Sequence, residues 1–502
     1  MAEYGETMKD LRASFATGKT RTYEWRAAQL KAVLKLVHEN EDKIAEVLTK
    51  DLHKSRIESE IMETILCVND AVDMINNVQD WMKGQKVSKS SIYIMDTAYV
   101  VKEPLGVVLV IGAWNYPIQL VLLPLIGAIA AGNCVVIKPS EVSEASAKFF
   151  EEVVPKYLDK DCFRVVNGGV PETTALLKER FDLIFYTGNS FVGKIVMKAA
   201  AEYLTPVVLE LGGKSPVYVD KDTNLTVVAR RLTWGKFCNA GQTCIAPDYV
   251  MCAPELQDEL VSKIKLVIDE FYTTDPKQSE SYGRIVNDKH YQRLQKLKEE
   301  GSVIAIGGED DEKDKYIAPT VIKDVKFTDK VMQEEIFGPI LPIIPIKDHQ
   351  EAIEIINNRE KPLAIYVFTN NKTVVQDFKT RTSSGGLLIN DTVVHAGLTS
   401  LPFGGVGNSG IGSYHGKYSF DAFSHSKPVL EKSLAIDQVN NVRYPPYTEN
   451  KRGWINWIMR KKVKRTGFFS FFPFVVMGAM FAMVFKTVGV TAEGILGNDD
   501  RA

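Results

Sequence analysis

Cysteine and histidine are scarce in this chain. Its 502 residues include six cysteines and seven histidines. No two cysteines form a Cys-x-x-Cys pair, which excludes a dense disulfide framework and indicates a reducing compartment. The histidines are scattered, with no His-x-x-x-His spacing and no Cys/His cluster, so we predict no metal site.

An excess of charge of either sign is also missing. The 61 Lys and Arg residues nearly balance the 63 Asp and Glu residues, for a formal net charge of −2. A basic surface for nucleic acid is therefore not expected over the bulk of the chain. Residues 1–6 contain no apolar run, so no signal peptide is expected there. The length favours two or more globular domains.

Apolar residues first recur at helical spacing. Two sets lie in the first eighty residues: Leu30, Val33, Leu34 and Val37, then Ile61, Ile65, Val68 and Val72. Each set predicts a helix. Residues 92–101 then become β-rich, and the pattern changes after them.

Short apolar runs then alternate with helical segments. The strand-like runs are 107–111, 134–137, 163–166, 183–186 and 207–210. Residues 118–131 are apolar over the length of a helix, which Gly132 closes. This alternation predicts an α/β fold with a doubly wound parallel sheet of the nucleotide-binding type. It restarts at 217–219, with a helix from Asn224, so we expect a second α/β domain running to about Asp421.

Cys244 ends a turn of small residues within 237–247. Ala240 and Gly241 allow close approach of the backbone to a ligand, and Pro247 prevents a long helix after the turn. A thiol presented in this way suits nucleophilic attack on a carbonyl. The alternative is that Cys244 is a small buried hydrophobic residue, which is a common fate for a free cysteine.

Two glycine patterns imitate known nucleotide motifs. Residues 188–195 nearly match a P-loop, but Ile195 has no hydroxyl for Mg²⁺, which disfavours an NTPase. A glycine turn between a strand and a helix can still bind a dinucleotide pyrophosphate. Residues 405–410 match Gly-x-Gly-x-x-Gly, yet no strand and helix flank them, so we expect a tight loop there.

Four polar residues follow predicted strands. Lys138 and Glu141 could reach ribose hydroxyls, or could lie at a solvated helix start with Ser140 as its N-cap. Glu210 could act as a general base on water. Asn115 could donate to an oxyanion, or could serve only the turn before Tyr116-Pro117.

Together these motifs resemble the aldehyde dehydrogenase family. The resemblance extends to about Lys427 and is carried by segments 114–117, 138–141, 187–193, 209–214, 241–244, 334–339 and 402–405. Several independent motifs in the family's order make it highly specific. The short N-terminal region and the C-terminal apolar run resemble the class 3 branch, and within it the membrane-bound fatty aldehyde dehydrogenases.

The resemblance implies a role for each matching residue. Cys244 would be the nucleophile, Glu210 the general base and Asn115 the oxyanion donor. The expected cofactor is NAD, with NADP possible, and its ligands would be Lys138, Glu141, Gly188, Gly193, Glu335 and Phe337. Phe191 departs from the family pattern because it places a bulky side chain in the pyrophosphate turn.

The resemblance also implies a domain plan. Residues 1–86 and 104–211 would form the NAD-binding domain, and residues 212–423 the catalytic domain. Residues 87–103 and 424–434 would form a small β bridging element that mediates a homodimer. Residues 435–467 would be a basic amphipathic linker.

Residues 468–485 form the longest uncharged stretch near the C-terminus. As a helix, these 18 residues would span ~27 Å, close to the hydrocarbon core of a bilayer. Five of the six residues at 460–465 are basic, against only Lys486 and Arg501 in the tail 486–502. For a C-terminal transmembrane helix there, the positive-inside rule predicts that the catalytic domain stays in the cytosol. We expect the endoplasmic reticulum membrane, because no retrieval or peroxisomal signal ends the chain.

The expected function is NAD(P)-dependent oxidation of medium- to long-chain aliphatic aldehydes to carboxylic acids. The route would pass through a thiohemiacetal and a thioester on Cys244, and water activated by Glu210 would hydrolyse the thioester. One alternative is a CoA-acylating aldehyde dehydrogenase, which does not need that base. Another is a non-catalytic membrane scaffold with the same fold.

Overall fold

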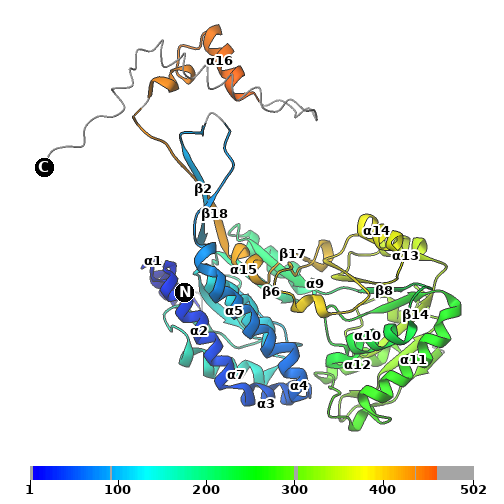
Figure 1. The fold of residues 1–502 in the computed structure, drawn as a ribbon. Helices are drawn as coiled ribbons and strands as arrows, with labels where there is room; N and C mark the ends of the chain where they lie inside the picture. The colour runs from blue at the N-terminus through cyan, green and yellow to red at the C-terminus, as the bar shows by residue number, and fades with distance from the viewer. Residues whose placement is uncertain (1–3, 91–92, 299–302, 436, 461–502) are drawn as a thin grey trace. The chain divides into compact units, whose positions relative to one another are not determined.

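The computed structural model describes residues 4–90, 93–298, 303–435 and 437–460. These residues divide into two compact units, one within 4–86 and 99–429 and the other within 87–98 and 430–460. The larger unit contains two large sheets with their helices, together with the small sheet of β11 (Asp310–Asp311) and β12 (Tyr316–Ile317). It is coloured from blue to orange along the chain in Figure 1.

A helical layer opens the larger unit. Its helices are α1 (Gly5–Ala16), α2 (Tyr23–Glu39), α3 (Glu41–Leu52), α4 (Arg56–Ser59) and α5 (Ile65–Trp81). A single π turn, η2 (Glu60–Thr64), links α4 to α5. The predicted helices are therefore present. Three residues of the second predicted set nevertheless lie exposed: Ile61 of η2, and Ile65 and Val72 of α5. The buried face of α5 instead carries Cys67, Ala71, Met74 and Val78.

The first sheet has six strands in the order β17-β7-β6-β3-β4-β5. Its strands are β3 (Val107–Ile111), β4 (Cys134–Lys138), β5 (Phe163–Val165), β6 (Leu183–Gly188), β7 (Val207–Leu211) and β17 (Gly410–Ile411). All are parallel except β17. The connecting helices are α6 (Gln119–Ala131), α7 (Glu144–Tyr157), α8 (Val170–Leu176) and α9 (Ser190–Ala201). Helix α6 is buried along its whole length, which explains its continuous apolar sequence.

The second sheet has seven strands in the order β10-β13-β14-β9-β8-β15-β16. They are β8 (Pro216–Val219), β9 (Tyr249–Cys252), β10 (Val303–Ile306), β13 (Thr320–Lys323), β14 (Ile340–Pro345), β15 (Ala364–Phe368) and β16 (Gly386–Ile389). Only β10 is antiparallel to its neighbour. Figure 1 shows helices α10 (Leu225–Phe237), α11 (Pro254–Tyr272), α12 (Asp288–Leu297), α13 (His349–Asn357) and α14 (Lys372–Arg381) around this sheet. The α/β fold with parallel sheets is thus confirmed.

A third, three-stranded sheet has the order β1-β2-β18. Its strands are β1 (Gln85–Lys86), β2 (Thr97–Pro104) and β18 (Ser424–Glu431).

Residues 405–410 form the expected tight loop, since a Cβ added at Gly405 would lie only 2.0 Å from the carbonyl oxygen of Ser409.

The smaller unit contains the helix α16 (Glu449–Met459) and an ion pair between Lys432 and Asp96 at 2.6 Å. In residues 4–90, 93–298, 303–435 and 437–460, no helix is both long and apolar enough to cross a membrane. The predicted span 468–485 lies outside these residues.

Candidate active site

A strained turn positions the candidate nucleophile. Helix α10 ends at Phe237, and the next residues include Asn239, Ala240 and Gly241 with φ of 51°, 50° and 76°. Left-handed backbone is costly for asparagine and alanine, so surrounding contacts must impose it. Cys244 follows this turn as a half-buried free thiol.

Hydrogen bonds provide those contacts. The backbone N–H of Asn239 donates to Oε1 of Glu58 at 2.6 Å. Its side-chain Nδ2 donates to the carbonyl oxygens of Asn115 at 2.8 Å and Gln242 at 3.1 Å. Gln242 is also buried and donates from Nε2 to the carbonyl of Arg284 at 2.9 Å. The turn is therefore bound to three distant parts of the chain.

The thiol of Cys244 has a raised pKa of about 12. Burial is the main cause, and the negative charges of Glu335 and Glu210 add to it. The free enzyme therefore holds Cys244 as a neutral thiol at pH 7. A positive charge brought close to the sulfur would favour the thiolate, which is the reactive form.

Asn115 lies beside this turn, just after strand β3. Its side-chain Nδ2 donates to the carbonyl oxygen of Gln242 at 3.0 Å, and the residue is buried. The neighbouring Tyr116 forms a hydroxyl–hydroxyl hydrogen bond of 2.6 Å with Thr243. An amide group carries two N–H donors, so one remains for an oxyanion next to Cys244.

Glu210 lies near the carboxyl end of strand β7, between Thr187 of β6 and Gly410 of β17. It is buried, and neither carboxyl oxygen has a hydrogen-bond partner. Burial raises the pKa of Glu210 well above its ordinary value. Its charge also contributes to the raised pKa of the Cys244 thiol. An unpartnered buried carboxyl group near the nucleophile fits a general base for water.

Glu335 and Phe337 belong to a loop that meets the same site. A Cβ on Gly212 would lie 2.2 Å from Oε2 of Glu335, so Glu335 packs against the turn after β7. Burial, with the charge of Asp248, raises the pKa of Glu335 to about 8. Phe337 has a left-handed φ of 48° and meets Trp114 edge to face at 5.3 Å.

The remaining candidates lie on the six-stranded sheet. Lys138 ends β4, is buried, and donates to Oε2 of Glu141 at 2.9 Å. Helix α7 begins only at Glu144, so Ser140 is not its N-cap. Gly188 ends β6 and pairs with Leu211, in the strand that carries Glu210. All these groups therefore share the carboxyl edge of this sheet.

The glycine turn after β6 fits a dinucleotide. A Cβ at Gly188 would lie 2.1 Å from the Tyr186 hydroxyl, and one at Gly193 would lie 2.8 Å from Cδ2 of Leu211. Both positions therefore require glycine, because a larger residue would clash with Tyr186 or Leu211, and the N-terminus of helix α9, which can bind a phosphate, directly follows Gly188. Phe191 points outward and is 73% exposed.

Comparison with known proteins identifies the family. The model of the "Aldehyde dehydrogenase family" matches residues 2–429. The chain belongs to the aldehyde dehydrogenase family. It is 52% identical to aldehyde dehydrogenase family 3 member A2 of Macaca fascicularis over 91% of this chain and 94% of that protein. It is also 52% identical to aldehyde dehydrogenase family 3 member B1 of Rattus norvegicus, over 89% and 96% of the two chains. These matches place it in class 3.

A solved structure has the same fold. The structure titled "Substrate bound state of Staphylococcus Aureus AldH" is similar with a TM-score of 0.89 and 41% identity, over 92% of this chain and all of that one. The protein is thus an enzyme of the aldehyde dehydrogenase fold. Aldehyde dehydrogenases use NAD or NADP.

Sequence reasoning missed the charged residues beneath this aldehyde dehydrogenase site. Lys54, Glu58 and Glu63 lie in the N-terminal helical layer. Both side chains of the Lys54–Glu63 ion pair are fully buried. Charged residues in a helical stretch usually face solvent, so no local pattern indicated that these three lie beneath the site.

Proposed function

We propose that this class 3 aldehyde dehydrogenase oxidises medium- to long-chain aliphatic aldehydes to carboxylic acids with NAD, NADP being possible. The observation that carries the proposed chemistry is the convergence of Cys244, Asn115 and an unpartnered Glu210. The charge of the unpartnered Glu210 acts on the Cys244 thiol, and Asn115 donates to the carbonyl oxygen of Gln242, two residues before Cys244.

The protein's residues divide the reaction into two stages. Sγ of Cys244 attacks the aldehyde carbon, and the free N–H of Asn115 stabilises the oxyanion of the thiohemiacetal. A bound nicotinamide dinucleotide would supply the hydride acceptor for this oxidation, so that the thiohemiacetal on Cys244 would become a thioester. Glu210 then takes a proton from water, which hydrolyses the thioester and releases the acid.

Lys138, Glu141, Gly188, Gly193, Glu335 and Phe337 would hold the cofactor. Lys138 and Glu141 would bind the adenosine ribose, and the glycine turn would bind the pyrophosphate. Glu335 would bind the nicotinamide ribose, with Phe337 packed on the nicotinamide. The glycines required between β6 and helix α9, and the half-buried Glu335 packed against Gly212, support this assignment.

Water as the acyl acceptor distinguishes this proposal from the CoA-acylating alternative. A buried general base is needed to activate water, whereas a CoA thiol does not require it. The presence of Glu210 therefore favours hydrolysis. Product analysis with and without CoA separates the two, since acyl-CoA as the main product would contradict the proposal.

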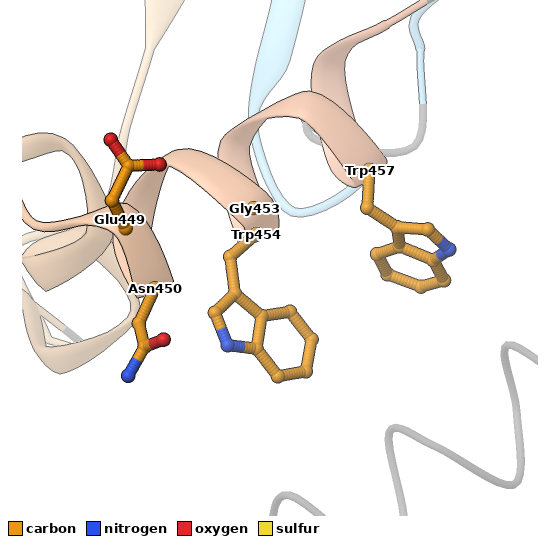
Figure 2. Close-up of a pocket in the computed structure, with 5 residues that line it drawn as sticks. All are labelled: Glu449, Asn450, Gly453, Trp454 and Trp457. Atoms are coloured by element: carbon orange, nitrogen blue, oxygen red, sulfur yellow. The ribbon is translucent and has the colours of Figure 1, made fainter.

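Membrane attachment supports a fatty substrate. Trp454 and Trp457 project from the same side of α16, with rings perpendicular at 6.1 Å (Figure 2). Both are about half exposed, and Lys451 and Arg452 lie on the same helix. Exposed tryptophans beside basic residues suit a membrane interface. We therefore propose an endoplasmic reticulum anchor at 468–485, with the catalytic domain in the cytosol.

A homodimer is the proposed assembly, mediated by residues 87–103 and 424–434. Strand β16 ends the seven-stranded sheet and is half-exposed, and most of β18 is exposed. Open strand edges are ready to pair with another chain. Light scattering on the detergent-solubilised full chain tests this proposal, because a monomer would contradict it.

Substrate choice is tested with a chain-length series from acetaldehyde to hexadecanal. We expect kcat/KM to rise with chain length in the full-length enzyme and in a variant ending at residue 460. A preference for acetaldehyde would contradict the fatty-aldehyde proposal. Alkaline carbonate extraction tests the anchor, since release of the full chain from membranes would exclude a span.

A further inference from the structure

A buried ion pair lies directly beneath the segment that carries Asn115. Nζ of Lys54 and Oε1 of Glu63 are 2.6 Å apart, and both side chains are completely buried. Lys54 follows helix α3, and Glu63 belongs to the π turn η2. A buried pair of this kind must recover a large desolvation cost through further hydrogen bonds.

Those further bonds all go to one turn. Nζ of Lys54 donates to the carbonyl oxygen of Asn115 at 2.9 Å and lies 4.0 Å from the centre of the Tyr116 ring. Oε2 of Glu63 accepts from the backbone N–H groups of Ile118 at 2.8 Å and Gln119 at 3.1 Å. The pair therefore holds the turn at both ends, from Asn115 to the start of helix α6.

The carbonyl of Asn115 is shared with the nucleophile turn. It accepts from Lys54 and also from Nδ2 of Asn239, while the Asn115 side chain donates to Gln242. Fixing this carbonyl fixes the peptide plane after Asn115 and so helps to hold the backbone from which the side chain projects, while the bond to Gln242 orients the amide itself. An oxyanion donor needs such a fixed direction, because misplacement by about 1 Å can cost ~10²-fold in rate.

We propose that Lys54 and Glu63 are positioning residues that aim the Asn115 amide at the reacting oxygen. The inference rests on the proposed role of Asn115 as the oxyanion donor. Neither residue touches the substrate in this scheme. In this proposal their main effect on catalysis passes through the Asn115 amide, and removal of that amide separates this effect from their contribution to folding and from the contact with Asn239.

The test is a double-mutant cycle on the full-length enzyme. The pair variant carries Lys54→Met and Glu63→Gln, which removes both charges and keeps an amide oxygen for the N–H groups of Ile118 and Gln119. The second change is Asn115→Ala, and the third enzyme carries all the substitutions. The readouts are kcat, KM and thermal unfolding for each enzyme.

We expect the pair variant to lower kcat about 10-fold or more, with KM changed by less than about threefold. In the Asn115→Ala background, the same pair substitution should lower kcat by less than about twofold. The pair substitution should lower the unfolding temperature by the same amount in both backgrounds, because the contribution of the ion pair to folding does not depend on the Asn115 amide.

A matched control uses the exposed pair of Lys50 and Glu46 on α3, whose atoms are 2.5 Å apart. Lys50→Met with Glu46→Gln removes the same charges and should leave kcat unchanged. Lys54→Arg keeps the charge but changes the donor geometry, and it enters the same cycle. If the pair variant does not fold, the kcat of Lys54→Arg in the two backgrounds tests the positioning role instead.

Two results overturn the positioning role while leaving Asn115 as the donor. One is an unchanged kcat in the pair variant, and the other is an equal loss of kcat in both backgrounds. If Asn115→Ala alone leaves kcat unchanged, the proposed oxyanion donor is wrong, and the positioning role falls with it.

Discussion

The carbonyl oxygen of Gly338 lies so close to Gly241 that a Cβ there would come within 2.3 Å of it. This contact joins the nucleophile turn to the loop that carries Glu335 and Phe337. Because Gly241 also has φ of 76°, only glycine fits both the space and the backbone. The two halves of the site are therefore packed together through main-chain atoms.

Gly241→Ala should consequently weaken both the fold and the site. We expect a loss of roughly 2 kcal/mol in the free energy of unfolding, because the new methyl group must displace a backbone carbonyl. The dehydrogenase activity should fall as the Cys244 turn shifts. Urea denaturation and steady-state kinetics measure the two effects. Gly5→Ala is the control, because a Cβ there meets nothing within 4 Å.

Cys244→Ser should abolish aldehyde-dependent NADH formation, because a serine hydroxyl is a far weaker nucleophile than a thiolate. Cys252→Ala removes another thiol, in strand β9, and should retain activity. Substantial turnover by Cys244→Ser would rule out the thiohemiacetal route.

Alkylation should report the raised pKa of Cys244. In the enzyme without cofactor, the rate of reaction with iodoacetamide should rise about tenfold per pH unit from pH 7 to 10, because the pKa is about 12. Mass spectrometry of the peptide containing Cys244 measures this rate. A plateau below pH 9 would show that the thiol ionises far more easily than its burial implies.

Glu210→Gln should separate the two stages of the reaction. The thioester would still form, so a burst of NADH close to one equivalent per active site is expected. Steady turnover should then fall at least ~10²-fold, because no base activates water. Rapid-mixing absorbance at 340 nm measures both phases, and unchanged steady turnover would assign the base elsewhere.

Asp70 should make the enzyme less stable as pH rises. Burial raises its folded pKa from 3.8 to about 7, so the folded state prefers the protonated carboxyl. Its stabilising contribution is complete below about pH 4 and is lost as pH rises to about 7. Asp70→Asn should remove this dependence and add up to about 4 kcal/mol at pH 8. Urea denaturation of both enzymes at pH 5 and pH 8 measures the free energy of unfolding. If Asp70→Asn changes that free energy equally at the two pH values, the assignment is contradicted.

Local patterns predicted most of the sheet framework. The run 107–111 matches β3, and the helix after Asn224 begins at Leu225 as expected. These elements follow from periodicity and caps, which are local properties. The strand near 163–166 ends one residue earlier, at Val165, which is an ordinary error for an element boundary.

The polar layer under the site could not be predicted in this way. Lys54 reaches a carbonyl 61 residues later, and Glu58 reaches an N–H 181 residues later. No local pattern signals such a partner. The π turn also breaks the helical periodicity at Glu60–Thr64, so the exposed Ile61 looked like a core residue.

The long reach of Glu58 has a consequence for synthesis of the chain. At ribosomal speeds of about 5–20 residues per second, its partner Asn239 follows roughly 10–40 s later. Until then the N-terminal helices emerge with a carboxylate whose eventual partner does not yet exist. Cys244, the proposed nucleophile, is made after Asn239, when that partner is already present, and Glu335 and Phe337 follow later still. A chain broken off before residue 239 therefore carries Glu58 without its partner and lacks Cys244.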